Sequence, residues 1–221
     1  MPRMIARPWV VLLAAGGSRR FGAPKQFARI GGESMLRRAV RSAVAIAPAG
    51  CVVVLGAQAG RLRQELSGLP AHVVVNRAWR RGLASSLAAG ISALPRTARA
   101  ALIVLADQAS LGPGDLALVA AAWQARPRSI VASLAGGILG PPALFPRRLF
   151  PELRRLHGDQ GARDLLRDPA RSVVGIELPR AALDVDTPAD AARVRNRTAR
   201  GRTPRSARSS PARRPRSSGG T

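Results

Sequence analysis

The chain has 221 residues, of which 46% are hydrophobic, and it carries a formal net charge of +24 at pH 7. This length supports one sizeable domain with its own core better than two. The charge alone suggests a nucleic-acid-binding protein, but ten of the arginines lie between residue 193 and the C-terminus, where no acidic residue occurs. The rest of the positive charge is spread thinly along the chain, which argues against a nucleic-acid-binding domain.

The last part of the sequence differs in composition from the rest. Residues 196–221 are rich in Arg, Ser, Pro and Gly and have almost no apolar side chains. Such a segment cannot bury enough surface to offset the entropy lost on ordering. We therefore predict a folded domain over residues 1–195 and a disordered tail over 196–221. The tail could hold RNA or an acidic partner electrostatically, or it could be a dispensable extension.

The sequence argues against three other classes of protein. Cys51 is the only cysteine, so neither an intrachain disulfide nor a cysteine zinc site can form. His72 and His157 are the only histidines and are far apart in sequence, which argues against a histidine metal cluster. The apolar run 9–15 is far below the roughly 18–20 residues of a membrane span. We expect a soluble, cytoplasmic protein without a membrane partner.

Short apolar runs alternate with longer helical stretches along the chain. The runs are almost wholly apolar, as in strands covered on both faces, and the stretch 34–46 places apolar and basic residues on opposite sides of a helix. The predicted strands are 9–14, 51–56, 72–76, 101–106 and 129–134, and the predicted helices are 34–46, 59–66, 83–94 and 113–123. This order predicts an α/β domain of three layers, α/β/α, with a mostly parallel sheet. In such sheets ligands bind beyond the carboxyl ends of the strands.

The first of these strand ends is followed by "LAAGGSRRFGAPK", residues 13–25, which ends at the only lysine of the chain. Small residues and glycines let backbone N–H groups approach phosphate oxygens. The spacing matches neither a Walker A loop nor the dinucleotide G-x-G-x-x-G pattern. We predict a triphosphate-binding loop of another geometry, with Arg20 and Lys25 neutralising the phosphates. The alternative is an ordinary strand-to-helix turn with solvated arginines.

Carboxylates follow two of the later apolar segments. Asp107 stands directly after the predicted strand 101–106, and Asp184 and Asp186 alternate in "LDVDTPAD". Magnesium usually binds through one or two carboxylates together with substrate phosphates. We therefore predict a Mg²⁺ site formed by Asp107 and Asp186. The alternative is that these residues cap helices or turns.

Two other stretches suggest substrate contacts. In "NRAWRRGLASSLAAGI", residues 76–91, Asn76 and the pair Ser85–Ser86 offer neutral donors and acceptors for a base or ribose. Trp79 could stack on a ring, but a core position fits it better. "GGILGPP", residues 136–142, and "HGDQGARDLL", residues 157–166, suggest loops that recognise a second substrate. A capped helix start at Asp159 is the alternative for the latter.

Taken together, these motifs resemble the MobA-like nucleotidyltransferases. "LAAGGSRRFGAPK" is similar to the L-A-A-G-x-S-x-R-M-G-x-x-K signature of that family, and "LADQ", "GPP", "GDQGARDLL" and "DVDTPAD" follow in the family's order. The best match is to the CTP:molybdopterin cytidylyltransferases, over residues 9–195. The resemblance implies a Rossmann-like domain that transfers CMP from CTP to a phosphate-bearing acceptor such as molybdopterin. It also implies release of pyrophosphate with Mg²⁺, and a molybdenum hydroxylase as a further partner.

The residues and the resemblance together give a candidate site. Lys25 and Arg20 are the predicted catalytic residues, and Asp107 and Asp186 the predicted metal ligands. The predicted nucleotide-binding residues are Leu13, Ala14, Ala15, Gly16, Gly17, Lys25, Asn76, Ser85 and Asp107. The predicted acceptor-binding residues are Gly140, Pro141, Gly158, Asp159 and Gly161.

Two alternatives to this function stay open. "PKQF", residues 24–27, resembles the cytidylyltransferases of isoprenoid biosynthesis. Those enzymes carry an Asp-Ala-Ala-Arg-Pro stretch after the fourth strand, and "ADQASL" here does not match it. A nucleotide-binding regulator or chaperone of molybdoenzyme maturation is the non-catalytic alternative, and the presence of Lys25, Asp107 and Asp186 argues against it.

Overall fold

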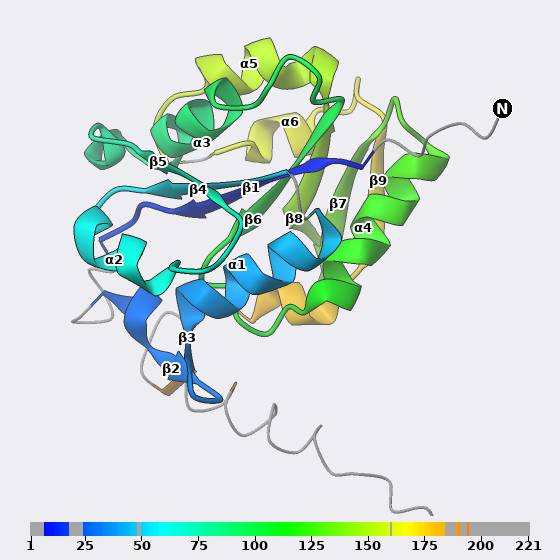
Figure 1. Cartoon of the computed structure of the whole chain (residues 1–221). Helices are drawn as coiled ribbons and strands as arrows, with labels where there is room; N and C mark the ends of the chain where they lie inside the picture. The colour runs from blue at the N-terminus through cyan, green and yellow to red at the C-terminus, as the bar shows by residue number, and fades with distance from the viewer. Residues whose placement is uncertain are drawn as a thin grey trace, which may run out of the picture.

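A seven-stranded sheet forms the centre of the molecule, with helices on both of its faces (Figure 1). The computed structural model describes residues 7–17, 24–47, 50–159, 161–183, 189–190 and 194. The strand order is β5-β4-β1-β6-β8-β7-β9, and a separate two-stranded sheet joins β2 and β3. This arrangement confirms the predicted Rossmann-like α/β/α fold.

The strands of the main sheet lie close to the apolar runs of the sequence. They are β1 (Trp9–Ala14), β4 (Cys51–Leu55), β5 (His72–Val75), β6 (Ala100–Leu105), β7 (Ile130–Ala135), β8 (Ile138–Pro146) and β9 (Val173–Glu177). The small sheet consists of β2 (Arg29–Ile30) and β3 (Glu33–Ser34). β8 runs antiparallel to both β6 and β7, and the other pairs in the main sheet are parallel.

The strand order reverses direction at β1. From β1 the chain moves outward to β4 and then β5 on one side, whereas β6 pairs with β1 on the other side. In open α/β sheets ligands bind at such a reversal, beyond the carboxyl ends of the two adjacent strands. The topology therefore predicts a ligand-binding site at the residues that follow β1 and β6.

The helices divide between the two faces of the sheet (Figure 1). One face is covered by α1 (Met35–Ile46), α2 (Ala59–Glu65) and α4 (Pro113–Ala125), and the other by α3 (Leu83–Ser92), α5 (Phe150–Arg155) and α6 (Arg163–Arg167). Short 3-10 turns complete the list: η2 (Lys25–Phe27), η3 (Trp79–Arg81), η4 (Arg147–Leu149) and η5 (Pro179–Ala182). Among the described residues, no helix combines the length and apolar character needed to cross a membrane.

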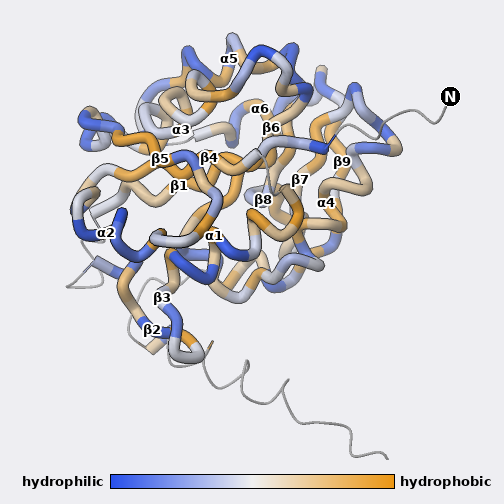
Figure 2. The backbone as a smooth tube through the Cα atoms, viewed as in Figure 1, coloured by the Kyte–Doolittle hydropathy of each residue, from blue (hydrophilic) through white to orange (hydrophobic). Residues whose placement is uncertain are grey.

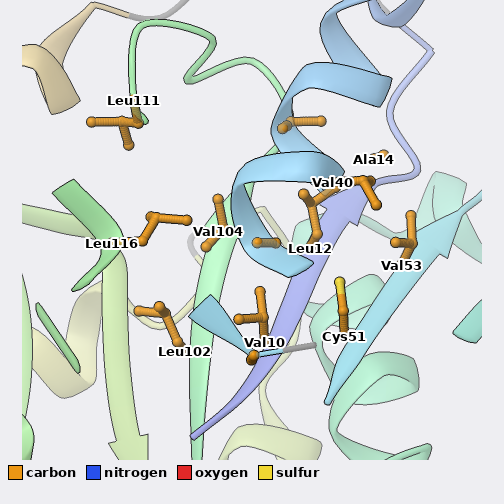
Figure 3. Close-up of a cluster of buried hydrophobic side chains, with 14 of the residues drawn as sticks. Val10, Leu12, Ala14, Val40, Cys51, Val53, Leu102, Val104, Leu111 and Leu116 are labelled. Atoms are coloured by element: carbon orange, nitrogen blue, oxygen red, sulfur yellow. The ribbon is translucent and has the colours of Figure 1, made fainter. Parts of the chain in front are cut away.

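Side chains that alternate along the strands build one core on each face. Val10, Leu12 and Ala14 of β1 join the cluster under α1 and α4, which Figure 3 shows in part. Val11 and Leu13 join the cluster under α3 and α5. Apolar residues accordingly concentrate in the strands, with polar residues on the outer sides of the helices (Figure 2). Burial also raises the pKa of the Cys51 thiol to about 12, so this cysteine is not a nucleophile at neutral pH.

Two expectations about the strands need correction. His72–Val75 was expected to be covered on both faces, but β5 is an edge strand in which His72 and Val75 are exposed. The stretch 136–142 was expected to be a loop, but from Ile138 it belongs to β8. The glycines and prolines in this stretch obscured the strand, because Pro cannot donate to a ladder and is usually confined to edges and bulges. Here the register of β7 and β8 shifts between Ala132 and Ser133, beside the two prolines.

Close packing of α3 on the sheet depends on Gly90. A Cβ added there would overlap Val11 Cγ1 and would lie 3.0 Å from Val54 Cγ2. Gly90→Ala should therefore destabilise the protein, because overpacking costs about 1–3 kcal/mol and the gain in helix propensity offsets at most ~1 kcal/mol. Urea unfolding measures the change, with Gly114→Ala as the control, since no atom lies within 4 Å of its added Cβ. Equal stabilities of Gly90→Ala and the unchanged chain would contradict this packing.

Candidate functional site

A cavity of about 140 Å³ opens at the carboxyl ends of β1 and β6. It is formed by the residues after these two strands, by the η2 turn and by the first turns of α1 and α3. The lining residues are Leu13, Ala14, Ala15, Gly16, Lys25, Gln26, Met35, Leu83, Ser86, Leu105, Ala106 and Asp107. Six of the predicted nucleotide-binding residues are thus brought together: Leu13, Ala14, Ala15, Gly16, Lys25 and Asp107.

The lysine and the first aspartate of the predicted site face each other in this cavity. Lys25 Nζ donates a hydrogen bond to Asp107 Oδ2 at 2.8 Å, and the two side chains are 15% and 23% exposed. The other oxygen of Asp107, Oδ1, is buried and has no hydrogen-bond partner in the structure as described. Opposite charges and an unsatisfied carboxylate oxygen therefore lie side by side, in a position shielded from most of the solvent.

Gln26 shapes the wall of the cavity next to Lys25. Its Nε2 atom donates to Gly16 O at 2.7 Å and, at 3.4 Å, to Ala14 O, and the residue is only 4% exposed. These bonds tie the η2 turn to the loop after β1. Gln26 was not among the predicted site residues, although its place directly after the only lysine was a usable signal.

Asn76 and Ser85 form an internal network. The Asn76 amide donates to Ser85 Oγ at 2.9 Å and to Ser86 Oγ at 3.0 Å, and its oxygen accepts from Ala78 N. Ser85 Oγ also donates to the carbonyls of Ala78 and Gly82. Of these residues only Ser86 lines the cavity. Asn76 and Ser85 thus hold Ser86 and the start of α3 in place, and a direct role in nucleotide binding remains a prediction for both.

Gly17 and Gly56 allow Trp79 to pack against the loop after β1. A Cβ on Gly17 would lie 3.2 Å from the Trp79 ring, and one on Gly56 would lie 2.7 Å from Trp79 Cβ. Trp79 is half-buried, and the Arg80 guanidinium lies 4.7 Å from the centre of its ring. Gly17 therefore lies against Trp79, and neither residue lines the cavity.

The first predicted acceptor motif lies on β8, next to the end of β6. Gly140 and Pro141 sit at the shift in register between β7 and β8. Ser133 Oγ donates to both of their carbonyl oxygens, at 2.9 and 2.8 Å. Gln108 Nε2 donates to Pro141 O at 2.7 Å. Because Gln108 directly follows Asp107, this bond links the acceptor motif to the loop that carries Asp107.

The second acceptor motif contacts the start of α3. Asp159 Oδ1 accepts from Leu83 N at 3.3 Å, and Gly158 O accepts from Ala84 N at 3.0 Å. A Cβ on Gly82 would lie 2.5 Å from Gly158 O, so the two loops are in direct backbone contact. Gly158 and Gly161 both have positive φ angles, of 71° and 60°. The loop is therefore fixed to the helix that also contributes Leu83 and Ser86 to the cavity.

Two predicted site residues, Arg20 and Asp186, lie outside the described residues, as does Asp184. Among the residues that the structure does describe, no group of three His, Cys, Asp or Glu side chains could hold a metal ion. A metal bound at Asp107 would thus depend on other ligands, among which substrate phosphates are the usual ones for Mg²⁺.

The chain is similar in sequence to two curated proteins and in structure to solved proteins. The chain is 34% identical over 175 residues to 2-C-methyl-D-erythritol 4-phosphate cytidylyltransferase of Stenotrophomonas maltophilia, covering 70% of this chain and 74% of that protein. It is 32% identical over 199 residues to the purine catabolism protein PucB of Bacillus subtilis, covering 84% of this chain and 94% of that protein. Among solved structures, Rv0371c of Mycobacterium tuberculosis superposes with a TM-score of 0.74 at 28% identity, covering 87% of this chain and 100% of that one.

Rv0371c has also been solved in complex with manganese, and that structure matches with a TM-score of 0.70 at 27% identity, covering 86% and 98%. Residues 10–173 of the present chain match the MobA-like NTP transferase domain. The chain therefore belongs to the MobA-like NTP transferase family.

Proposed function

We propose that the protein transfers CMP from CTP to a phosphate group of a small acceptor and releases pyrophosphate. The observation that carries this proposal is the pairing of Lys25 and Asp107 inside one cavity at the ends of β1 and β6. The cavity thus offers a cation for phosphate oxygens beside a carboxylate for a divalent ion. The similarity to a cytidylyltransferase supports CTP as the nucleotide.

The chain's part in the reaction is to position charges. The acceptor phosphate attacks the α-phosphorus of CTP in line with the leaving pyrophosphate, and little covalent work falls to the protein. The loop from Leu13 to Gly16 lets backbone N–H groups approach the nucleotide. The Lys25 ammonium, held at the cavity wall next to Gln26, neutralises charge on the phosphates. Leu83 and Met35 add apolar surface to the cavity lining.

The residues present fit a divalent ion. Asp107 Oδ1 is buried and, within the described part of the chain, has no hydrogen-bond partner, so it is available as a ligand. We propose that Asp107 and Asp186 hold Mg²⁺ together with the phosphates, and the manganese complex of the similar Rv0371c supports a divalent ion. When bound, such an ion polarises the α-phosphoryl oxygen and neutralises developing charge.

Molybdopterin is the acceptor we favour. The order of "LADQ", "GPP", "GDQGARDLL" and "DVDTPAD" resembles the molybdopterin branch of the family. The loop after β6 lacks the arginine that the isoprenoid enzymes carry there. The β7–β8 hairpin also projects beyond the carboxyl edge and exposes 68% of Ile138, an apolar contact for a flat ring system. A molybdenum hydroxylase would then receive the product in the cytoplasm.

Methylerythritol phosphate is the second candidate acceptor. The relative that carries this activity in its name is 34% identical and shares 74% of its own length with this chain. The stretch "PKQF" around Lys25 also resembles that branch. A small polyol phosphate would need fewer apolar contacts than molybdopterin, so it would leave Ile138 without a role.

Pyrophosphate release tests the proposal. The full chain is mixed with each of CTP, GTP, ATP and UTP, with Mg²⁺ or Mn²⁺, and with molybdopterin, methylerythritol phosphate or no acceptor. We expect pyrophosphate from CTP with molybdopterin, and a cytidylylated product by mass spectrometry. Release only with methylerythritol phosphate would favour the second candidate. Nucleotide binding without pyrophosphate from any pair would instead indicate a regulator or chaperone and contradict the proposed function.

A further inference from the structure

The loop that follows β6 carries Asp107 and is anchored on two sides. On one side Arg38 Nε of α1 donates to Ala109 O at 3.0 Å. On the other side Ser110 Oγ donates to Arg180 O of η5 at 2.9 Å. Gln108 lies directly after Asp107 and before both anchored residues, and it is 4% exposed.

Gln108 spans a gap in the main sheet. β6 and β8 are paired as far as Ile103 and Ala143, and past this pair the two strands separate. Across the separation Gln108 Nε2 donates to Pro141 O of β8 at 2.7 Å and to Ala181 O of η5 at 3.1 Å. The residue thus replaces the missing ladder with side-chain bonds, and it does so from the position next to the predicted metal ligand.

The amide of Gln108 is costly in this position. Its Oε1 atom is buried and has no hydrogen-bond partner among the described residues. An unsatisfied buried acceptor opposes folding, and an apolar side chain of similar size would avoid that cost. One of the two acceptors, Pro141 O, also accepts a hydrogen bond from Ser133 Oγ at 2.8 Å. Stability alone thus gives a weak reason for an amide here, whereas fixed geometry between three segments gives a strong one.

We propose that Gln108 is a positioning residue for the divalent ion, which it serves by holding the Asp107 carboxylate in register with two other segments. Pro141 belongs to the predicted acceptor side, and Ala181 lies in the turn that precedes Asp186 in sequence. The three bonded segments therefore include Asp107 and one acceptor motif. The inference rests on the proposed function, because it assigns Asp107 to a metal site.

The test measures Mn²⁺ binding by electron paramagnetic resonance, in the presence of a non-hydrolysable CTP analogue. Gln108→Met keeps the size of the side chain and removes both donors and the orphaned acceptor. We expect its Mn²⁺ affinity to fall about 10–100-fold, the usual effect of losing a group that orients a metal ligand. Binding of the CTP analogue without metal should stay unchanged. Ser110→Ala is the matched control, because it removes the other bond from this loop to η5 without touching β8.

Three results would overturn the proposal: an unchanged Mn²⁺ affinity in Gln108→Met, an equal loss in Ser110→Ala, or a loss of metal-free nucleotide binding. Thermal unfolding shows whether Gln108→Met folds. If it does not, Gln108→Asn gives the same test, since it keeps the amide but is one methylene too short to reach both carbonyls. The measurement of Mn²⁺ affinity does not depend on turnover. A fall in Mn²⁺ affinity in Gln108→Met, together with no pyrophosphate release by the unchanged protein, would support the positioning role of Gln108 and contradict only the transferase activity.

Discussion

Replacing Lys25 by arginine should lower kcat/KM for nucleotidyl transfer about as far as replacing it by alanine, by roughly 10²–10³-fold. The lone lysine of the chain lies in the cavity with its Nζ atom 2.8 Å from Asp107 Oδ2 and only 15% of its side chain exposed. A charge-conserving change at an exposed position would be nearly silent. In the cavity the same change should lower activity, because the shape of the cation decides which oxygen atoms it can contact.

The difference lies in how the two cations meet a carboxylate. An ammonium is a compact point charge that one carboxylate oxygen or several phosphate oxygens can satisfy. A guanidinium is a planar fork that pairs with both oxygens of a carboxylate at once. In the Lys25→Arg variant it would therefore engage Asp107 Oδ1 as well as Oδ2, since Oδ1 is buried and lacks a partner within the described residues. It would occupy the place of the divalent ion and stay away from the phosphates.

Binding of Mn²⁺ without nucleotide distinguishes the two variants. In Lys25→Ala no ammonium competes for Asp107, so the Mn²⁺ affinity should rise, by about 5–150-fold if the coupling has the usual size. In Lys25→Arg it should fall. Arg126→Ala is the control for loss of one positive charge, because Arg126 is exposed and lies at the end of α4, away from the cavity. Near-normal turnover in Lys25→Arg would contradict the argument from the shape of the cation.

The parts of the fold that could be predicted are those whose burial is uniform. The central strands β1, β4 and β6 read as continuous apolar runs because both of their faces are covered. The start of α1 was also predicted to within one residue, since Ser34 caps the helix through its hydroxyl and Arg37 N. β8 was missed because its pairing is held partly by side chains, such as Ser133 and Gln108, which compensate for the prolines.

The candidate site divides in a similar way. Lys25 and Asp107 are 82 positions apart, and the rule that ligands bind at the carboxyl ends of parallel strands was enough to bring them together. The role of Asn76 was harder to predict, because its amide groups are used by Ser85, Ser86 and Ala78. A sequence shows which side chains carry donors, but not which neighbours already satisfy them. Gln26 escaped notice for the same reason, since its bonds go to backbone carbonyls.

Asp107→Asn should abolish the metal dependence of nucleotide binding and lower kcat/KM by roughly 10²–10³-fold, the usual effect of losing one charge contact to the transition state. Asparagine keeps the size of the side chain and one carbonyl oxygen, so Lys25 can still donate to it. The negative charge, however, is lost, and with it the preference of the site for a divalent cation. The same change removes a carboxylate that repels the triphosphate when no metal is bound.

Two titrations therefore move in opposite directions in Asp107→Asn. Metal-free binding of a CTP analogue, measured by calorimetry, should tighten, because Lys25 no longer has a charged partner and the phosphates no longer face an anion. The further tightening that Mn²⁺ produces in the unchanged protein should disappear. Asp164→Asn makes the same chemical change at an exposed position in the first turn of α6 and should alter neither titration. A damaged fold would weaken both titrations together, whereas loss of the ligand role of Asp107 strengthens one and removes the other. If Mn²⁺ still enhanced binding in Asp107→Asn, the metal site would have to lie elsewhere.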